Sequence, residues 1–183
     1  MDKTRSMRWA VFAAAIVLGL THPAWAGSSN DTDDVTFAVG NSLSITDTMG
    51  NFTLTFANTT NGSDSDNKTV IYTVTANNMP NTALTGAVSA KINALVSGIT
   101  LKANPGAYTN NGSAGNATLD TAVATYTDVT TTAVNLYNKP VTTGAQGKVL
   151  NGLVGINYKA TATRDLAASD GGTVTLTVTL KDA

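Results

Sequence analysis

The clearest pattern in the chain is a strict alternation of threonine with aliphatic residues near its C-terminal end. Thr173 to Leu180 reads Thr-Val-Thr-Leu-Thr-Val-Thr-Leu, so one face of an extended strand is apolar and the other carries hydroxyls. The same alternation occurs upstream, at Val154, Ile156, Tyr158, Ala160 and Ala162. Because a polar, glycine-ended stretch at 164–172 separates the two runs, we predict that these strands pair as an antiparallel hairpin.

The N-terminal half shows shorter runs with the same period of two. Alternating apolar residues predict strands at 35–39, 43–45, 52–56 and 70–76, with glycine and asparagine between them. The stretch 58–67 contains only small polar residues, which favour local bonds between side chain and backbone over a strand ladder. We therefore predict an exposed loop there.

The segment 84–96 fits two patterns. Val88, Ala90, Ile92, Ala94 and Val96 alternate as in a strand, whereas Leu84, Val88, Ile92 and Leu95 lie on one face of a helix. A strand is favoured because β-patterns surround the segment on both sides, and a helix remains the alternative. A short strand at 99–101, a mobile excursion at 104–116 and two strands near 122–126 and 133–136 complete the prediction.

Many short strands separated by turn residues at intervals of about ten residues predict an all-β fold, an antiparallel two-sheet β-sandwich. The C-terminal stretch, Tyr158-Lys-Ala-Thr-Ala-Thr followed by a polar turn and Gly172-Thr-Val-Thr-Leu-Thr-Val-Thr-Leu180, resembles the closing hairpin of bacterial secreted Ig-like sandwiches. Fimbrial subunits and spore-coat-U-like surface proteins share this kind of ending. The resemblance implies an Ig-like or fimbrial-like sandwich at a bacterial surface.

The first 26 residues have the pattern of a secretory signal peptide. A basic start is followed by the apolar run Trp9 to Leu20 and then by Ala24-Trp25-Ala26, a small-x-small cleavage motif. The apolar run is shorter than the roughly 20 residues that span a bilayer. We expect cleavage before Gly27, a flexible acidic tail at 27–34, a single sandwich domain at 35–183, and a product in the periplasm, at the cell surface or outside the cell, with no membrane span after cleavage.

Composition argues against catalysis in the expected product. From Gly27 onward the sequence has no Cys, no His, no Glu, no Trp and a single Arg. A serine nucleophile would then depend on a lysine as its base, and the alternation places Lys91 and Lys159 opposite the aliphatic face, where nothing predicts their burial. Eight basic residues against eleven acidic ones, with the lysines scattered, also give no reason to expect nucleic acid binding.

Two weak binding sites remain. Asp64, Asp66 and Asn67 bring together hard oxygen ligands, of which Ca²⁺ takes about six to eight, although the run lacks the glycine and distal glutamate of a calcium loop. A polar hairpin loop explains the same residues. No other cofactor is expected. Tyr108 and Tyr137 are the tyrosines expected to be exposed and able to stack on a sugar, whereas Tyr72 alternates with core-facing residues.

A threonine-rich sandwich without catalytic side chains suggests a structural or adhesive surface protein. Such a protein could be a fimbria-like or coat subunit that associates with itself or with other surface subunits. Unpaired strand edges bind other strands through their backbone groups, and the last strand and the segment 35–39 lie near the termini. Alternatively, both are ordinary strands of a monomer. A monomeric module that binds glycans or cell-wall polymer is the second hypothesis.

Overall fold

The computed structural model describes residues 38–112, 116–142 and 145–183, and the strands lie in the compact unit Val39–Ala183. The predicted signal peptide, the acidic tail and residues 35–37 of the first predicted strand lie outside the described residues. Residues 38–42 are not part of a strand. In the described residues the only helical segment is a short 3-10 helix, Ala145–Lys148.

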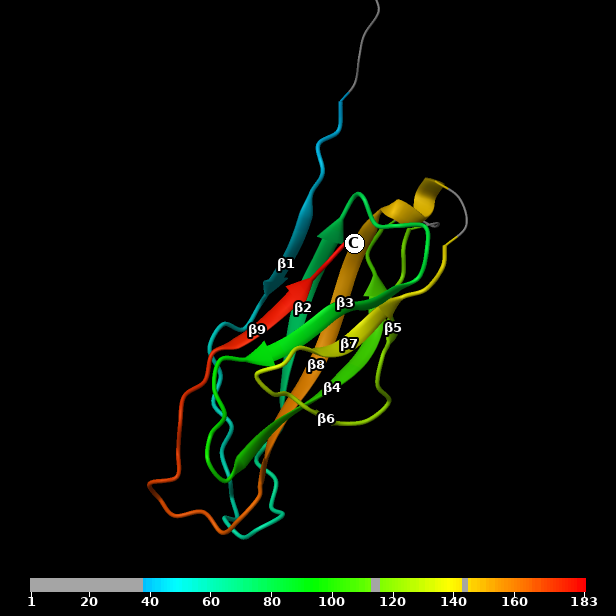
Figure 1. Ribbon diagram of the computed structural model, residues 1–183. Helices are drawn as coiled ribbons and strands as arrows, with labels where there is room; N and C mark the ends of the chain where they lie inside the picture. The colour runs from blue at the N-terminus through cyan, green and yellow to red at the C-terminus, as the bar shows by residue number, and fades with distance from the viewer. Residues whose placement is uncertain (1–37, 113–115, 143–144) are drawn as a thin grey trace, which may run out of the picture. The chain divides into compact units, whose positions relative to one another are not determined.

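Two antiparallel sheets form the fold (Figure 1), as the alternation predicts. One sheet has five strands in the order β1-β2-β8-β4-β6. Its strands are β1 (Leu43–Asp47), β2 (Lys68–Ala76), β8 (Leu150–Ala162), β4 (Ile99–Asn110) and β6 (Thr127–Asp128). The second sheet has four strands in the order β5-β7-β3-β9. Its strands are β5 (Asp120–Thr121), β7 (Val134–Lys139), β3 (Leu84–Ile92) and β9 (Leu176–Leu180).

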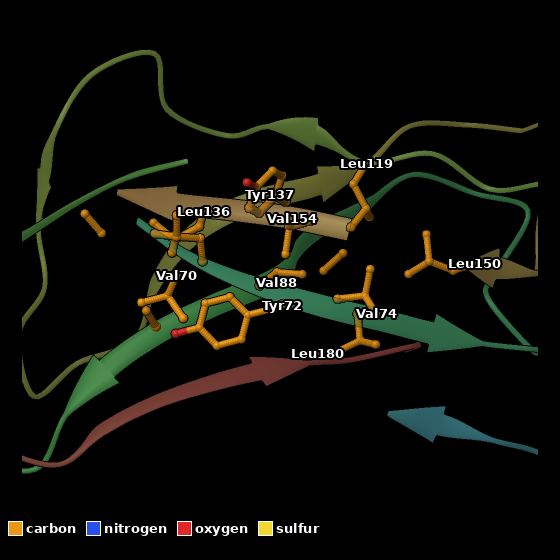
Figure 2. Packing of buried hydrophobic residues seen from close by; sticks show 14 of the residues in the cluster. Val70, Tyr72, Val74, Val88, Leu119, Leu136, Tyr137, Leu150, Val154 and Leu180 are labelled. Atoms are coloured by element: carbon orange, nitrogen blue, oxygen red, sulfur yellow. The ribbon is translucent and has the colours of Figure 1, made fainter. Parts of the chain in front are cut away.

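The inward faces of the two sheets build one apolar core. Every second residue of β8 is buried from Leu150 to Ala162, which is the period that a half-buried strand produces. Figure 2 shows side chains from both sheets meeting between them, with Val74 of β2 near Leu180 of β9. The chain is thus an all-β, two-sheet antiparallel sandwich, as predicted.

The predicted pairing of the last two long strands is wrong. β8 lies in the middle of the five-stranded sheet, and β2 and β4 occupy both of its edges. Because β8 has no free edge along most of its length, β9 crosses to the other sheet and pairs with β3, Ala90 lying opposite Val178. The alternation in β9 is real, but it says nothing about which strand the alternating residues pair with.

The predicted mobile excursion at 104–116 is also wrong for most of its length. Residues up to Asn110 belong to β4, a twelve-residue strand that pairs with β8 on both sides of Pro105. The register shifts between Pro105 and Tyr108, a bulge that accommodates a residue with no N–H to donate. The hydroxyl of Tyr137 lies 2.9 Å from the carbonyl oxygen of Gly106 and 3.0 Å from that of Gly155, so it supplies a hydrogen-bond donor at this bulge.

The stretch 58–67 is mostly exposed and contains no strand, as predicted for an exposed loop, but three of its residues make ladder bonds that its composition argued against. Gly62 and Ser65 donate backbone N–H groups to the carbonyls of Ala162 and Ala160, and Ala162 donates back to Ser63. These bonds continue the five-stranded sheet beyond the end of β2. The predicted strand at 52–56 is reduced to a single bridge between Phe56 and Ser65.

The ambiguous segment 84–96 is a strand over Leu84–Ile92, as favoured. Gly86 has a φ of 64°, a left-handed conformation that glycine adopts readily, and the register of β3 on β7 shifts around it. The helical spacing of Leu84, Val88, Ile92 and Leu95 is therefore coincidental. The strands predicted near 122–126 and 133–136 are found displaced, as the short β5 and β6 and the longer β7.

Candidate functional site

The outermost strands β1 and β9 lie on the same side of the sandwich. β1 ends the five-stranded sheet and β9 ends the four-stranded sheet. Figure 1 shows the two strands next to each other, and some of their Cα atoms lie within 8 Å, yet they do not pair. We call this side of the sandwich the open edge. Two strand edges near one another are a natural place for another polypeptide segment to bind.

Within residues 38–112, 116–142 and 145–183, the backbone of β1 bonds only to β2, on one side. Thr48 donates its N–H to Ile71, and Asn77 donates to the carbonyl of Ser42. In an antiparallel ladder the bonded positions alternate, so Leu43, Ile45 and Asp47 direct their N–H and C=O groups away from β2. Among the described residues, no hydrogen bond is found to these outward backbone groups.

β9 shows the same arrangement against β3. Asn93 donates its N–H to Thr175, and Lys181 donates to Ala87, so the bonded positions of β9 are odd-numbered. Leu176, Val178 and Leu180 therefore direct their backbone groups away from β3. Within the described part of the chain these groups too lack a partner. The open edge thus presents two rows of backbone donors and acceptors.

Between the two strands lies an open hollow of about 470 Å³. Its apolar walls are Ile45 from β1 and Leu176 and Val178 from β9, all three half-buried. The residues that carry unpaired backbone groups therefore also supply the apolar side chains. This combination suits a bound strand, because its backbone would bond to the edge while its alternate side chains entered the hollow.

One end of the hollow is polar and negative. Asp47 lines it together with Tyr72, and its Oδ1 accepts hydrogen bonds from the N–H groups of Met49 (3.1 Å) and Gly50 (2.7 Å). The ring of Tyr72 is buried, and its hydroxyl lies 3.2 Å from that of Tyr158. Burial, and to a smaller extent the nearby Asp47 carboxylate, raises the pKa of Tyr72 above its ordinary value of 10. A segment that carries a hydrogen-bond donor at this end would match the carboxylate.

The opposite side of the sandwich is more closed. Its outermost strands, β5 and β6, have two residues each, and very short edge strands limit pairing with other chains. Ala117, Leu119 and Val129 beside these strands are buried in the core. The open edge is therefore the better candidate for strand pairing.

The side-chain oxygens of the three candidate calcium ligands, Asp64, Asp66 and Asn67, bind other side chains of the protein. Asp64 contacts Lys159 Nζ at 2.5 Å and accepts the Thr161 hydroxyl at 2.6 Å, and these bonds, chiefly the one from Lys159, lower the pKa of Asp64. Asp66 pairs with Lys68 at 2.9 Å. Asn67 accepts the hydroxyl of Tyr126 at 3.1 Å. Across the described ranges no three acidic or histidine side chains gather as a metal site would require. These oxygens are thus engaged in ion pairs and hydrogen bonds.

The two tyrosines proposed for sugar stacking are not both accessible. Tyr137 is completely buried, so its predicted exposure is wrong: it lies opposite Val88 of β3, at the irregular part of that pairing. Tyr108 is half-buried beside a shallow hollow of about 590 Å³ that Leu119 and Asp120 also line. Its hydroxyl is buried without a hydrogen-bond partner in the described structure.

The pattern of residues gave no sign of a buried lysine. Lys139 at the end of β7 is fully buried, and its Nζ donates to the carbonyl of Pro140 (3.0 Å) and to Thr142 Oγ1 (2.6 Å). Burial lowers the pKa of its ammonium group. Lys139 lies before a proline and beyond the strand predicted at 133–136, where a charged residue is expected to be exposed, so only the tertiary structure places it inside.

Comparisons with known proteins do not assign the fold or the open edge to a family. No family model, no curated protein and no solved structure matches this chain. A search of the described residues for helices long and apolar enough to cross a membrane finds none.

Proposed function

We propose that the protein is an exported, non-catalytic structural or adhesive component of a bacterial cell surface, which associates with other copies or other subunits through the open edge. The observation that carries the proposal is the coincidence of unpaired backbone groups and half-buried apolar side chains on Ile45, Leu176 and Val178. Backbone bonds would supply affinity, and the hollow would select the side chains of the partner.

Export is supported by the signal-like pattern of residues 1–26, and the absence of catalysis by the composition that follows it. Of the two lysines weighed as bases, Lys159 is engaged with Asp64 and lies 4.5 Å above the ring of Tyr126. Lys91 lies opposite Thr177 at the outer face of the second sheet and is exposed. Neither lysine has the buried surroundings that activate a base or nucleophile.

The experiment compares charge insertions on the two faces of each edge strand. Ile45→Asp and Val178→Asp place a carboxylate in the hollow, whereas Ser44→Asp and Thr179→Asp place the same charge on the outer faces of the same strands. Size-exclusion chromatography and negative-stain microscopy of the product that begins at Gly27 measure assembly. Circular dichroism melting verifies that each variant is folded.

We expect the unmodified protein to form large oligomers or filaments. Assembly should be lost in the two hollow variants and retained in their outer-face controls. Deletion of residues 27–39 tests whether the segment 35–39 takes part. A protein that stays monomeric at every concentration, or hollow and control variants that behave alike, would overturn the proposal. A lasting monomer that is retained by cell-wall polysaccharide would support the glycan-binding alternative.

A further inference from the structure

We propose that neighbouring copies exchange β9, so that the last strand of one copy completes the four-stranded sheet of the next. This inference rests on the proposed function, because it adds an exchange of β9 to the association of copies at the open edge. Two features of the structure carry it: the position of β9 at the end of its sheet and a pair of adjacent glycines before it.

β9 has one neighbouring strand in the part of the chain that the structure describes. It pairs there with β3, and its side chains Leu176 and Val178 pack against the core but remain half-buried at the hollow. Only Leu180 is buried in the core. A strand with a single neighbour and a partly exposed apolar face leaves its sheet more readily than a strand such as β8, which has neighbours on both sides.

A flexible joint lies immediately upstream. The connection from β8 is tied down as far as Asp170, whose carboxylate contacts Arg164 at 2.9 Å and accepts the N–H of Ala167 at 2.7 Å. Gly171 and Gly172 follow, both exposed, and two adjacent glycines give the backbone wide conformational freedom. The chain can therefore change direction there while the preceding turn keeps its bonds.

The exchanged part is small, because β9 has only five residues. In the exchanged form β9 would make the same pairs with β3 of the next copy that it makes here with its own, from Val88–Leu180 to Ile92–Leu176. Exchange of identical elements costs little because the contacts are preserved.

Geometry keeps the exchanging copies close together. The residues from Gly171 to Thr175 span at most about 3.3–3.6 Å each when extended, or roughly 17 Å in total. A neighbour must therefore place its β3 beside the hinge of the donor, next to the open edge. Reciprocal exchange would give a closed dimer, and sequential exchange an open chain of copies.

A pair of engineered cysteines tests the exchange directly, because the chain contains no cysteine. Ser89 and Thr179 lie directly opposite each other on β3 and β9, at a spacing of about 5.5 Å between Cα atoms that a disulfide can bridge. The double variant Ser89→Cys with Thr179→Cys is assembled under reducing conditions, oxidised, and run on a denaturing gel without reductant. Lys91→Cys with Thr177→Cys, the next pair on the same face, repeats the test if the first variant does not fold.

The matched control joins strands that cannot exchange. Thr69 and Asn157 lie opposite each other on β2 and β8, with their side-chain oxygens 2.6 Å apart. Thr69→Cys with Asn157→Cys should give only monomers on the same gel. For the β9 pair we expect covalent dimers or a ladder of multimers, and protein oxidised as a dilute monomer should lose at least tenfold in assembly.

The outcomes separate the exchange from the proposed function. Assemblies whose β9 disulfide runs as a monomer would overturn the exchange and leave edge-mediated association intact. A protein that never assembles would overturn both. Covalent multimers in the control as well as in the β9 pair would show random cross-linking between neighbours and would also refute the exchange.

Discussion

The hydroxyl of Tyr137 should make a measurable contribution to stability, because it is the donor at the β4 bulge. Tyr137→Phe removes one buried hydroxyl and leaves the ring in place. The carbonyl oxygens of Gly106 and Gly155, which lie 2.9 and 3.0 Å from the Tyr137 hydroxyl oxygen, then lose this donor. A net hydrogen bond contributes about 0.5–1.5 kcal/mol, and a buried acceptor left without a donor costs about 1–3 kcal/mol. The hydroxyl has one hydrogen for two acceptors, so we expect a loss of about 2 kcal/mol.

Urea unfolding followed by far-ultraviolet circular dichroism measures this change, with the free energy of unfolding extrapolated to water. The melting temperature should fall by roughly 4–8 °C for a domain of this size. Tyr126→Phe is the matched control, because the Tyr126 hydroxyl makes a single exposed bond to Asn67 and its loss should cost less than about 0.5 kcal/mol. Equal stability of the Tyr137 variant and the control would refute the role assigned to the bulge.

Three further predictions test the fold and the ion pairs. Gly152→Ala should destabilise the protein strongly, because the added Cβ would lie only 2.4 Å from the backbone oxygen of Thr109. In Gly155→Ala the added Cβ meets nothing closer than 4.0 Å, so this variant should be as stable as the unmodified protein or more stable by about 0.5–1 kcal/mol. Urea unfolding of both variants measures the difference. Burial raises the pKa of Tyr72 and Tyr158, so the contribution of these two tyrosines to stability should be constant below about pH 10, where unfolded tyrosine ionises, and should fall above it. In a Tyr126→Phe variant, which lacks the exposed tyrosine hydroxyl, tyrosinate absorbance that appears before unfolding would contradict this. A calcium chelator should leave the melting temperature unchanged, because lysines already neutralise the two candidate carboxylates; a clear decrease would restore the calcium site.

The fold class follows from local patterns because a half-buried strand needs a period of two. Residues 70–76 and 154–162 were assigned correctly on that basis, and each is buried at every second position. Strand partners are a property of the whole chain. The pairing of β9 with β3 depends on β2 and β4 occupying both edges of β8, and no short window of residues contains that information.

The open edge was only partly predictable. The last strand was expected to be a free edge, and the structure places β9 at the end of its sheet. The part played by Asp47 and Tyr72 was not foreseen, because they come together only when β1 pairs with β2. Pro105 predicts an interrupted strand because proline usually ends a strand, whereas in the structure a bulge accommodates it. Lys139 was missed because charge predicts exposure.

The distance along the chain between β3 and β9 has a consequence for biogenesis. β3 ends at Ile92 and β9 begins at Leu176, so nearly half of the polypeptide is made after β3 and before its outer neighbour. Synthesis runs from the N-terminus, and this flank of β3 therefore stays unpaired until residues 176–180 have been made. Until then the unpaired edge of β3 can pair with strands of other chains. A chain that terminates shortly before residue 176 should therefore aggregate or be captured by chaperones.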